Sequence, residues 1–141
     1  MDAQMERDYF WGCFDRFVKE NGNKFYATHI KQGKNQAAGN INNISPMAMQ
    51  TICCEYKYQE QVILVQVYIN GNQRLFDYLH ANKKTIEKDL GYEVEWIEKG
   101  KFSSSVRRIQ KKFYINKSIE LMVKEVYPYI LDFIRVFEKY L

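Results

Sequence analysis

Two long stretches of the chain place apolar residues at helical spacing. In residues 2–20 they recur every three or four positions, Asp2 can cap the start, and Asn21-Gly22 can end the helix. The last run follows Ser118, a second expected cap, and continues to the end of the chain. Pro128 lies inside this run and predicts a kink or a break, because proline lacks the backbone N–H that a helix needs.

A third helical run follows Asn70-Gly71-Asn72. These residues resemble a hairpin turn, but Leu75, Leu79, Ile86 and Leu90 then recur at helical intervals. We therefore expect Asn72 to be an N-cap, Gly91 to end the run, and a break near Asn82 to divide it into two short helices.

A β-hairpin is predicted from two neighbouring stretches with a period of two. Residues 62–69 are the clearer strand, with alternate apolar side chains directed to one face. Residues 49–58 form the other strand, with Cys54 and Tyr56 on one face and Glu55 and Lys57 on the opposite one. One face is expected to be buried and the other mostly wet.

The other extended segments are less regular. Residues 25–30 are predicted as a short strand, and residues 32–43, rich in Asn, Gln and Gly, as a loop. Residues 92–97 form a strand with Val94 and Trp96 inward. Residues 102–115 form the next strand, and their poor alternation favours a bulge or an edge position.

This order of elements predicts an α+β fold and a single domain, residues 1–141. We expect an antiparallel sheet of four or five strands, with the N-terminal and C-terminal helices packed on one face and the short helix pair between hairpins. The predicted core contains Ile63, Val65, Val67, Ile69, Trp96, Phe14, Phe17, Ile130 and Phe137.

Composition narrows the class of protein. Hydrophobic residues make up 46% and charged residues 27%, as in ordinary globular domains. No stretch approaches the roughly 18 apolar residues of a membrane span, and the polar start is unlike a secretory signal. Three cysteines do not suggest a disulfide framework. We expect a cytoplasmic domain without a membrane partner.

Glu55-Tyr56-Lys57 is the strongest catalytic motif in the sequence. Restriction-type nucleases hold a divalent metal with a strand carboxylate two residues before a lysine, and they need a second acidic ligand. No acidic residue lies between Glu20 and Glu55, so an ion pair on a solvated strand is the favoured interpretation. Two distant histidines, His29 and His80, do not suggest a metal site, and we predict no catalytic residue, metal or cofactor.

Residues 99–117 are strongly basic and contain no acidic residue, whereas the whole chain carries only +4. Nucleic-acid binding through phosphate contacts is one interpretation. The other is protection of an edge strand by long charged side chains, which we favour because neighbouring positions of a strand point to opposite faces. The candidate residues are Lys99, Lys101, Arg107, Arg108, Lys111, Lys112 and Lys117.

Aromatic residues are abundant in the last helix, which carries more apolar surface than a one-sided helix needs. Its aromatic residues are Tyr127, Tyr129, Phe133, Phe137 and Tyr140. We expect the surplus to form a homodimer face or to contact another protein.

The chain resembles the bacterial and archaeal family known as domain of unknown function 4268. The resemblance rests on Tyr9-Phe10-Trp11, on the segment from Val65 to Trp96 (VQVYIN, then LFDYLHANKKTIEKDLGYEVEW), and on Val136-Phe137. It implies a stand-alone copy of a domain that often follows a restriction-endonuclease-like domain. No catalytic residues are implied, since none are established for the family.

The sequence thus predicts a non-enzymatic binding module, with an accessory role in bacterial DNA defence implied by the resemblance. A metal-dependent nuclease using Glu55 and Lys57 is the alternative from another class. Weak, sequence-tolerant nucleic-acid binding through residues 99–117 is the third interpretation.

Overall fold

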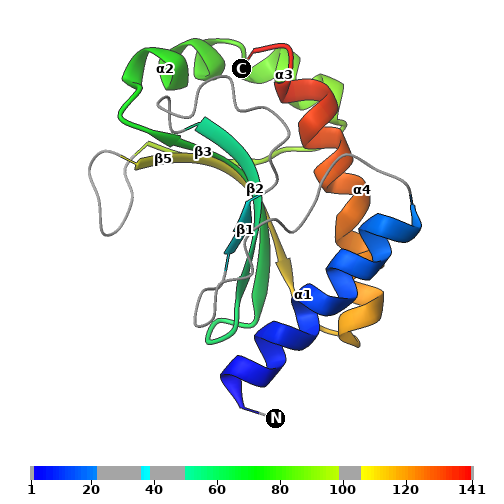
Figure 1. The fold of residues 1–141 in the computed structure, drawn as a ribbon. Helices are drawn as coiled ribbons and strands as arrows, with labels where there is room; N and C mark the ends of the chain where they lie inside the picture. Colours follow the sequence, from blue (N-terminus) through cyan, green and yellow to red (C-terminus); the bar gives the residue numbers. More distant parts are fainter. Residues whose placement is uncertain (1, 22–35, 39–49, 99–105, 141) are drawn as a thin grey trace.

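The computed structural model describes residues 2–21, 36–38, 50–98 and 106–140. It contains four helices and a five-stranded antiparallel sheet of order β1-β2-β3-β5-β4 (Figure 1). The α+β prediction is confirmed. The elements are α1 (Ala3–Glu20), β1 (Gln36–Ala38), β2 (Gln50–Lys57), β3 (Val62–Asn70), α2 (Gln73–Ala81), α3 (Lys83–Leu90), β4 (Glu95–Ile97), β5 (Val106–Tyr114) and α4 (Ile119–Phe137).

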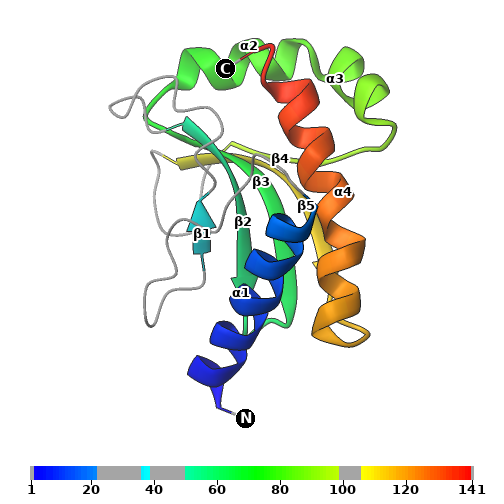
Figure 2. The ribbon, with the colours of Figure 1, turned by 45° about the vertical axis from the view of Figure 1, so that its right-hand side comes forward.

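The helices form one layer against the sheet. Helices α1 and α4 lie side by side over one face, and α2 and α3 cross one end of the sheet (Figures 1 and 2). The rings of Phe17 and Tyr127, 5.0 Å apart, join α1 to α4. We call the face under α1 and α4 the helix-covered face, and the opposite one the second face. None of the helices in the described ranges is long and apolar enough to span a bilayer.

The core lies between the helices and the helix-covered face. Alternate residues of β3, from Ile63 to Ile69, are fully buried there, and Tyr56 of β2 stacks on Phe10 of α1 at 4.6 Å. Phe14, Ile130 and Phe137 are also buried, so these core predictions are confirmed. Phe17 and Trp96 are only partly buried and pack against the core from its edge.

Local signals set the helix ends as the sequence predicts. The side chains of Asp2, Asn72 and Ser118 each accept a hydrogen bond from the backbone N–H three residues later. Gly91 ends α3 with a φ of 89°, a left-handed conformation that favours glycine. Asn82 separates α2 from α3, as expected.

A break at Pro128 does not occur, because α4 runs from Ile119 to Phe137 without interruption. Buried side chains hold the helix on the sheet on both sides of the proline, Val126 before it and Ile130 after it. This packing outweighs the loss of one helical hydrogen bond.

Two predictions for the extended segments need correction. Within the predicted loop 32–43, Gln36–Ala38 forms β1, which pairs with Cys53–Glu55 of β2. These three residues form a strand because they pair with β2; their own sequence shows no alternation that predicts one. Residues 102–115 are predicted to bulge or to lie at an edge. Strand β5 has no bulge, and Arg108–Gln110 lie between β3 and β4, whereas Lys111–Tyr114 pair with β3 alone among the described residues. The predicted strand 25–30 lies outside the described residues.

The second face is also drier than predicted. Glu55, Leu64, Gln66 and Gln110 are all buried on it. Only Gln66 interrupts the apolar run of β3, which is typical of a strand covered on both faces. A polar cluster is therefore held inside the protein.

Candidate binding groove and the second face of the sheet

The pairing register determines which side chains share the second face. Directly opposed residues of neighbouring strands point the same way, so Cys53, Gln66 and Gln110 form one row across β2, β3 and β5. Glu95 of β4 extends this row, because it is paired with Gln110. Polar groups from four strands thus meet on one face.

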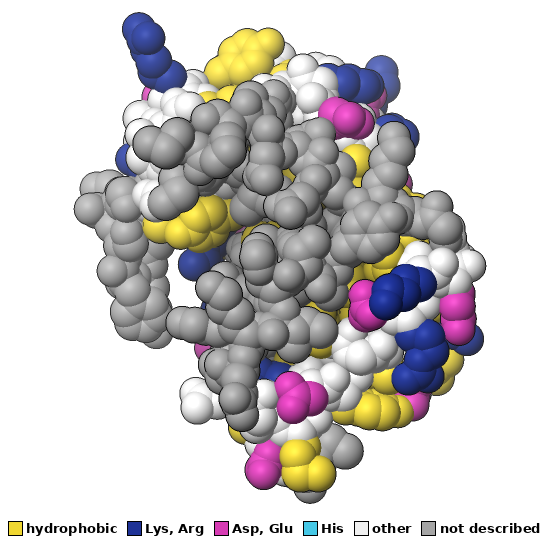
Figure 3. Space-filling model, in the orientation of Figure 1, with side chains coloured by type: hydrophobic (Ala, Val, Ile, Leu, Met, Phe, Trp, Pro, Cys, Tyr) yellow, Lys and Arg dark blue, Asp and Glu magenta, His cyan; other side chains and the backbone are white. Residues whose placement is uncertain are grey.

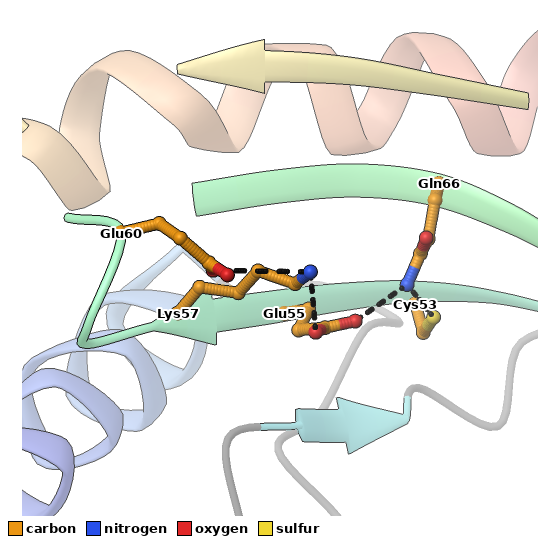
Figure 4. Close-up of polar contacts among 5 residues, drawn as sticks. All are labelled: Cys53, Glu55, Lys57, Glu60 and Gln66. Atoms are coloured by element: carbon orange, nitrogen blue, oxygen red, sulfur yellow. Dashed lines mark hydrogen bonds and ion pairs between the residues drawn. The ribbon is translucent and has the colours of Figure 1, made fainter. Parts of the chain in front are cut away.

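Gln66 is the centre of a buried hydrogen-bond network (Figure 4). Its Nε2 donates to Glu55 Oε2 at 3.1 Å and contacts Cys53 Sγ at 3.3 Å. Lys57 Nζ lies 3.8 Å from Glu55 Oε1 and 3.8 Å from Glu60 Oε2. The Glu55 side chain is only 8% exposed, so these groups replace the water that a buried carboxylate would otherwise need.

This network gives Glu55 and Lys57 a structural role. They share a face, as predicted, but the acidic residues of α1 face the other side of the sheet, where Glu6 accepts a hydrogen bond from Tyr56 OH at 3.0 Å. In the part of the chain that the structure describes, no three His, Cys, Asp or Glu residues are grouped to hold a metal ion.

The three cysteines are free and buried. Burial raises the pKa of Cys53 to about 12, with a further contribution from the charge of Glu55, and raises the pKa values of Cys13 and Cys54 as well. Since the thiolate is the reactive form, these raised pKa values disfavour thiol chemistry at the three side chains.

The structure divides the predicted basic segment between the two faces. Arg108 and Lys112 lie on the second face, whereas Arg107 and Lys111 lie on the helix-covered side of the same strand. Lys117, beyond β5, forms an ion pair with Glu125 at 3.3 Å. Lys99 and Lys101 lie outside the described residues.

Three of these basic side chains lie over tyrosine rings. Arg108 is 5.8 Å from the Tyr68 ring centroid and Lys112 is 6.0 Å from that of Tyr114, both on the second face. Lys111 is 5.3 Å from the Tyr92 ring. Elsewhere the surface mixes both signs: Figure 3 shows acidic and basic side chains close together over α1, where Lys19 pairs with Asp15 at 3.0 Å.

A groove of about 540 Å³ separates the approach to β4 from the second half of β5. We call it the β4–β5 groove. Glu95 and Gln110 lie at its end, where the pairing of the two strands begins. Its lining residues are Glu93, Val94, Glu95, Gln110, Lys111, Lys112 and Tyr114.

Several polar groups of this groove have no polar partner among the described residues. None of its two lysines and two glutamates forms an ion pair within the described ranges. Gln110 is 95% buried, and its Oε1 has no hydrogen-bond partner among the described residues. Tyr114 is 68% exposed.

A family profile matches residues 6–136, which is most of the chain, under the description "domain of unknown function (DUF4268)". The chain belongs to this family. The family resemblance inferred from the sequence is therefore confirmed. Comparisons with curated proteins and with solved structures gave no match.

Sequence reasoning missed the groove of this DUF4268 domain. It predicted a strand over residues 92–97, but β4 contains only Glu95–Ile97. The difference arises from tertiary contacts, which no local pattern records. The buried network had one visible signal, the single polar residue Gln66 within the apolar alternation of β3.

Proposed function

We propose that this DUF4268 domain is a non-enzymatic binding module whose ligand occupies the β4–β5 groove. One observation supports this most directly: the groove gathers four charged side chains without ion-pair partners, in the described part of the chain, beside the unpartnered amide of Gln110. Buried polar groups are normally hydrogen-bonded, so an incoming ligand gains interactions that the protein alone does not make.

The polar groups elsewhere on the second face support binding over catalysis. Glu55 is engaged by Gln66 and Lys57, and burial keeps the thiol of Cys53 protonated. Free, buried thiols also agree with a cytoplasmic location, which we propose for the protein. Because the family resemblance implies an association with nucleases, the module is proposed to act as an accessory in DNA defence.

The nuclease alternative is tested by incubating the purified protein with plasmid and Mg²⁺ or Mn²⁺. We expect no cleavage by the wild type or by Glu55→Ala. Lys57→Ala is the matched variant, because it removes the other half of the same ion pair. Cleavage by the wild type that both substitutions abolish would refute the binding-module proposal.

Nucleic-acid binding is the second candidate, and the paired cations and rings of Arg108–Tyr68 and Lys112–Tyr114 favour it. In nucleic-acid-binding proteins, such cations contact phosphates and such rings stack on bases. Fluorescence anisotropy with single- and double-stranded oligonucleotides at two salt concentrations tests it.

For this candidate the two faces of β5 provide a matched control. If the second face binds nucleic acid, Arg108→Gln with Lys112→Gln lowers the slope of log affinity against log salt by roughly two, at ~0.7–0.9 per phosphate contact. Arg107→Gln with Lys111→Gln then has a much smaller effect. Equal effects of the two pairs, or no binding near 150 mM salt, exclude a nucleic-acid site on this face.

A protein partner, including a second copy of the chain, remains part of the proposal. The aromatic surplus of α4 contributes less to this than expected, because Tyr127, Phe133 and Phe137 are buried within one chain. Leu121 and Leu131, 51% and 40% exposed, are the apolar side chains that α4 offers to a partner. Sedimentation showing only a 16.9 kDa species at all concentrations would exclude the homodimer.

A further inference from the structure

The open side of β5 differs along its length. Pairing with β4 covers only Arg108–Gln110, whereas pairing with β3 covers all nine residues of β5. Within the described part of the chain, the last four residues of β5, Lys111 to Tyr114, therefore have a neighbouring strand on one side only. A strand edge of this kind is a template for another strand.

The hydrogen bonds of the chain show which backbone groups of β5 face the groove. The N–H of Ile115 donates to Gln61 O at 3.0 Å, toward the β3 side. Backbone groups alternate between the two sides of an antiparallel strand, so Phe113 and Lys111 also point toward β3. Lys112 and Tyr114 then direct their N–H and C=O groups into the β4–β5 groove.

The segment before β4 is held out of this position by its own contacts. The N–H of Val94 donates to Glu87 Oε2 of α3 at 3.0 Å, and Tyr92 OH donates to Asp132 Oδ2 of α4 at 3.2 Å. The Tyr92 ring also packs on Tyr129 at 5.0 Å. These contacts draw residues 92–94 toward the helices, and the sheet is left incomplete beside Lys112.

We propose that the β4–β5 groove binds an extended peptide segment of a partner protein, which adds to the sheet as a strand antiparallel to β5. This rests on the proposed function and specifies its ligand class. Two residues of the partner exchange main-chain hydrogen bonds with Lys112 and Tyr114, continuing the line of β4. Strand addition of this kind takes its affinity from the main chain and its specificity from alternate side chains.

The side chains of the groove define the partner sequence. The partner residue opposite Lys112 lies beside an ammonium group that no carboxylate pairs within the described residues, so it is acidic. The residue opposite Tyr114, two positions earlier in an antiparallel partner, meets a ring that is 68% exposed, so it is aromatic. The recognised pattern is aromatic-x-acidic.

The same groove is less suited to a nucleic-acid strand. Glu93 and Glu95 line it together with the lysines, and their carboxylates repel a continuous row of phosphates. A peptide strand carries alternating donors and acceptors and a single charge opposite Lys112. The charge pattern therefore favours a peptide over a polyanion.

The test uses a fluorescein-labelled peptide, Thr-Phe-Val-Glu-Val-Thr, and two N-methylated versions of it. In the proposed register the Glu N–H donates to Lys112 C=O, whereas the N–H of the preceding Val points away from β5. N-methylation at Glu should weaken binding at least tenfold, and N-methylation at Val less than twofold. The two peptides have the same composition, and the protein is unchanged.

The site is located by ¹⁵N–¹H spectra of the full chain during the same titration. The amides of Lys112 and Tyr114 should shift most, and Lys112→Gln should weaken binding about threefold and remove its salt dependence. Equal binding of the two N-methylated peptides, or no binding of the parent peptide at 1 mM, would overturn strand addition. Shifts at the same amides with dT₁₂ but not with the peptide would also overturn it, while leaving the groove as a binding site.

Discussion

The buried network around Gln66 gives a sharp prediction for Gln66→Glu. In the wild type, Gln66 Nε2 donates to Glu55 Oε2 at 3.1 Å, and Gln66 has no exposed surface. The substitution keeps the shape of the side chain but places a second carboxyl against Glu55. At an effective dielectric constant of about 20, two unit charges about 3 Å apart repel by roughly 5 kcal/mol.

Protonation of the introduced carboxyl avoids this repulsion at lower cost. A glutamic acid with an ordinary pKa of about 4.3 requires roughly 3.7 kcal/mol to stay protonated at pH 7. The shared proton then restores one hydrogen bond to Glu55. We therefore expect Gln66→Glu to lower the free energy of unfolding by about 4 kcal/mol at pH 7.

The loss should depend on pH with a defined sign. The pKa of the introduced carboxyl is higher in the folded than in the unfolded state, so the folded state keeps a proton that the unfolded state releases. Relative to the wild type, the variant is hardly destabilised near pH 4 and loses about 1.4 kcal/mol for each pH unit above that.

Urea unfolding at pH 5, 6 and 7, followed by circular dichroism, measures this dependence. The double variant Glu55→Gln, Gln66→Glu is the matched control, because it exchanges the amide and the carboxylate and should recover most of the lost stability. A destabilisation that is independent of pH, or no recovery in the exchanged pair, would show that Glu55 and Gln66 do not share this hydrogen bond.

Three further predictions concern the rest of the fold. Val67→Asp places an unpaired charge in the fully buried centre of β3 and should cost about 3–5 kcal/mol in urea unfolding; melting like the wild type would contradict the strand facing. Gly91→Ala should cost about 1 kcal/mol, because φ is 89° there and no atom crowds the added methyl; an unchanged midpoint would argue against the left-handed cap. Burial raises the pKa of Cys53 to about 12 and that of its neighbour Cys54 as well, so Ellman's reagent at pH 8 should label neither thiol in the folded protein and both in urea; fast labelling of either before urea would disprove this.

The helices were predictable because their signals are local. The caps at Asp2, Asn72 and Ser118 and the glycine at position 91 act within a turn of their own helix. The facing of β3 followed from its alternation for the same reason. Burial of the helix-covered face then required only that amphipathic elements meet.

The groove and the network depend on contacts between distant parts of the chain. Val94 meets Glu87, Tyr92 meets Asp132, and Gln66 meets Glu55 only after the sheet has formed. The irregular sequence of β5 predicts an edge strand because of its many charged residues. In the structure, Arg108 and Lys111 lie over tyrosine rings, and strand periodicity does not reveal such contacts. The sequence pattern alone could place Glu55 and Lys57 on one face, but it could not predict the burial of Glu55.

The position of β5 in the sheet has a consequence for synthesis of the chain. The strand lies between β3 and β4, yet it is made after both of them. While residues up to 98 leave the ribosome, at about 5–20 residues per second, β3 can pair with β2 but keeps its other edge unpaired. That edge belongs to the most apolar strand of the sheet, so the nascent chain passes through a stage that is prone to aggregation until Val106–Tyr114 inserts and closes the sheet.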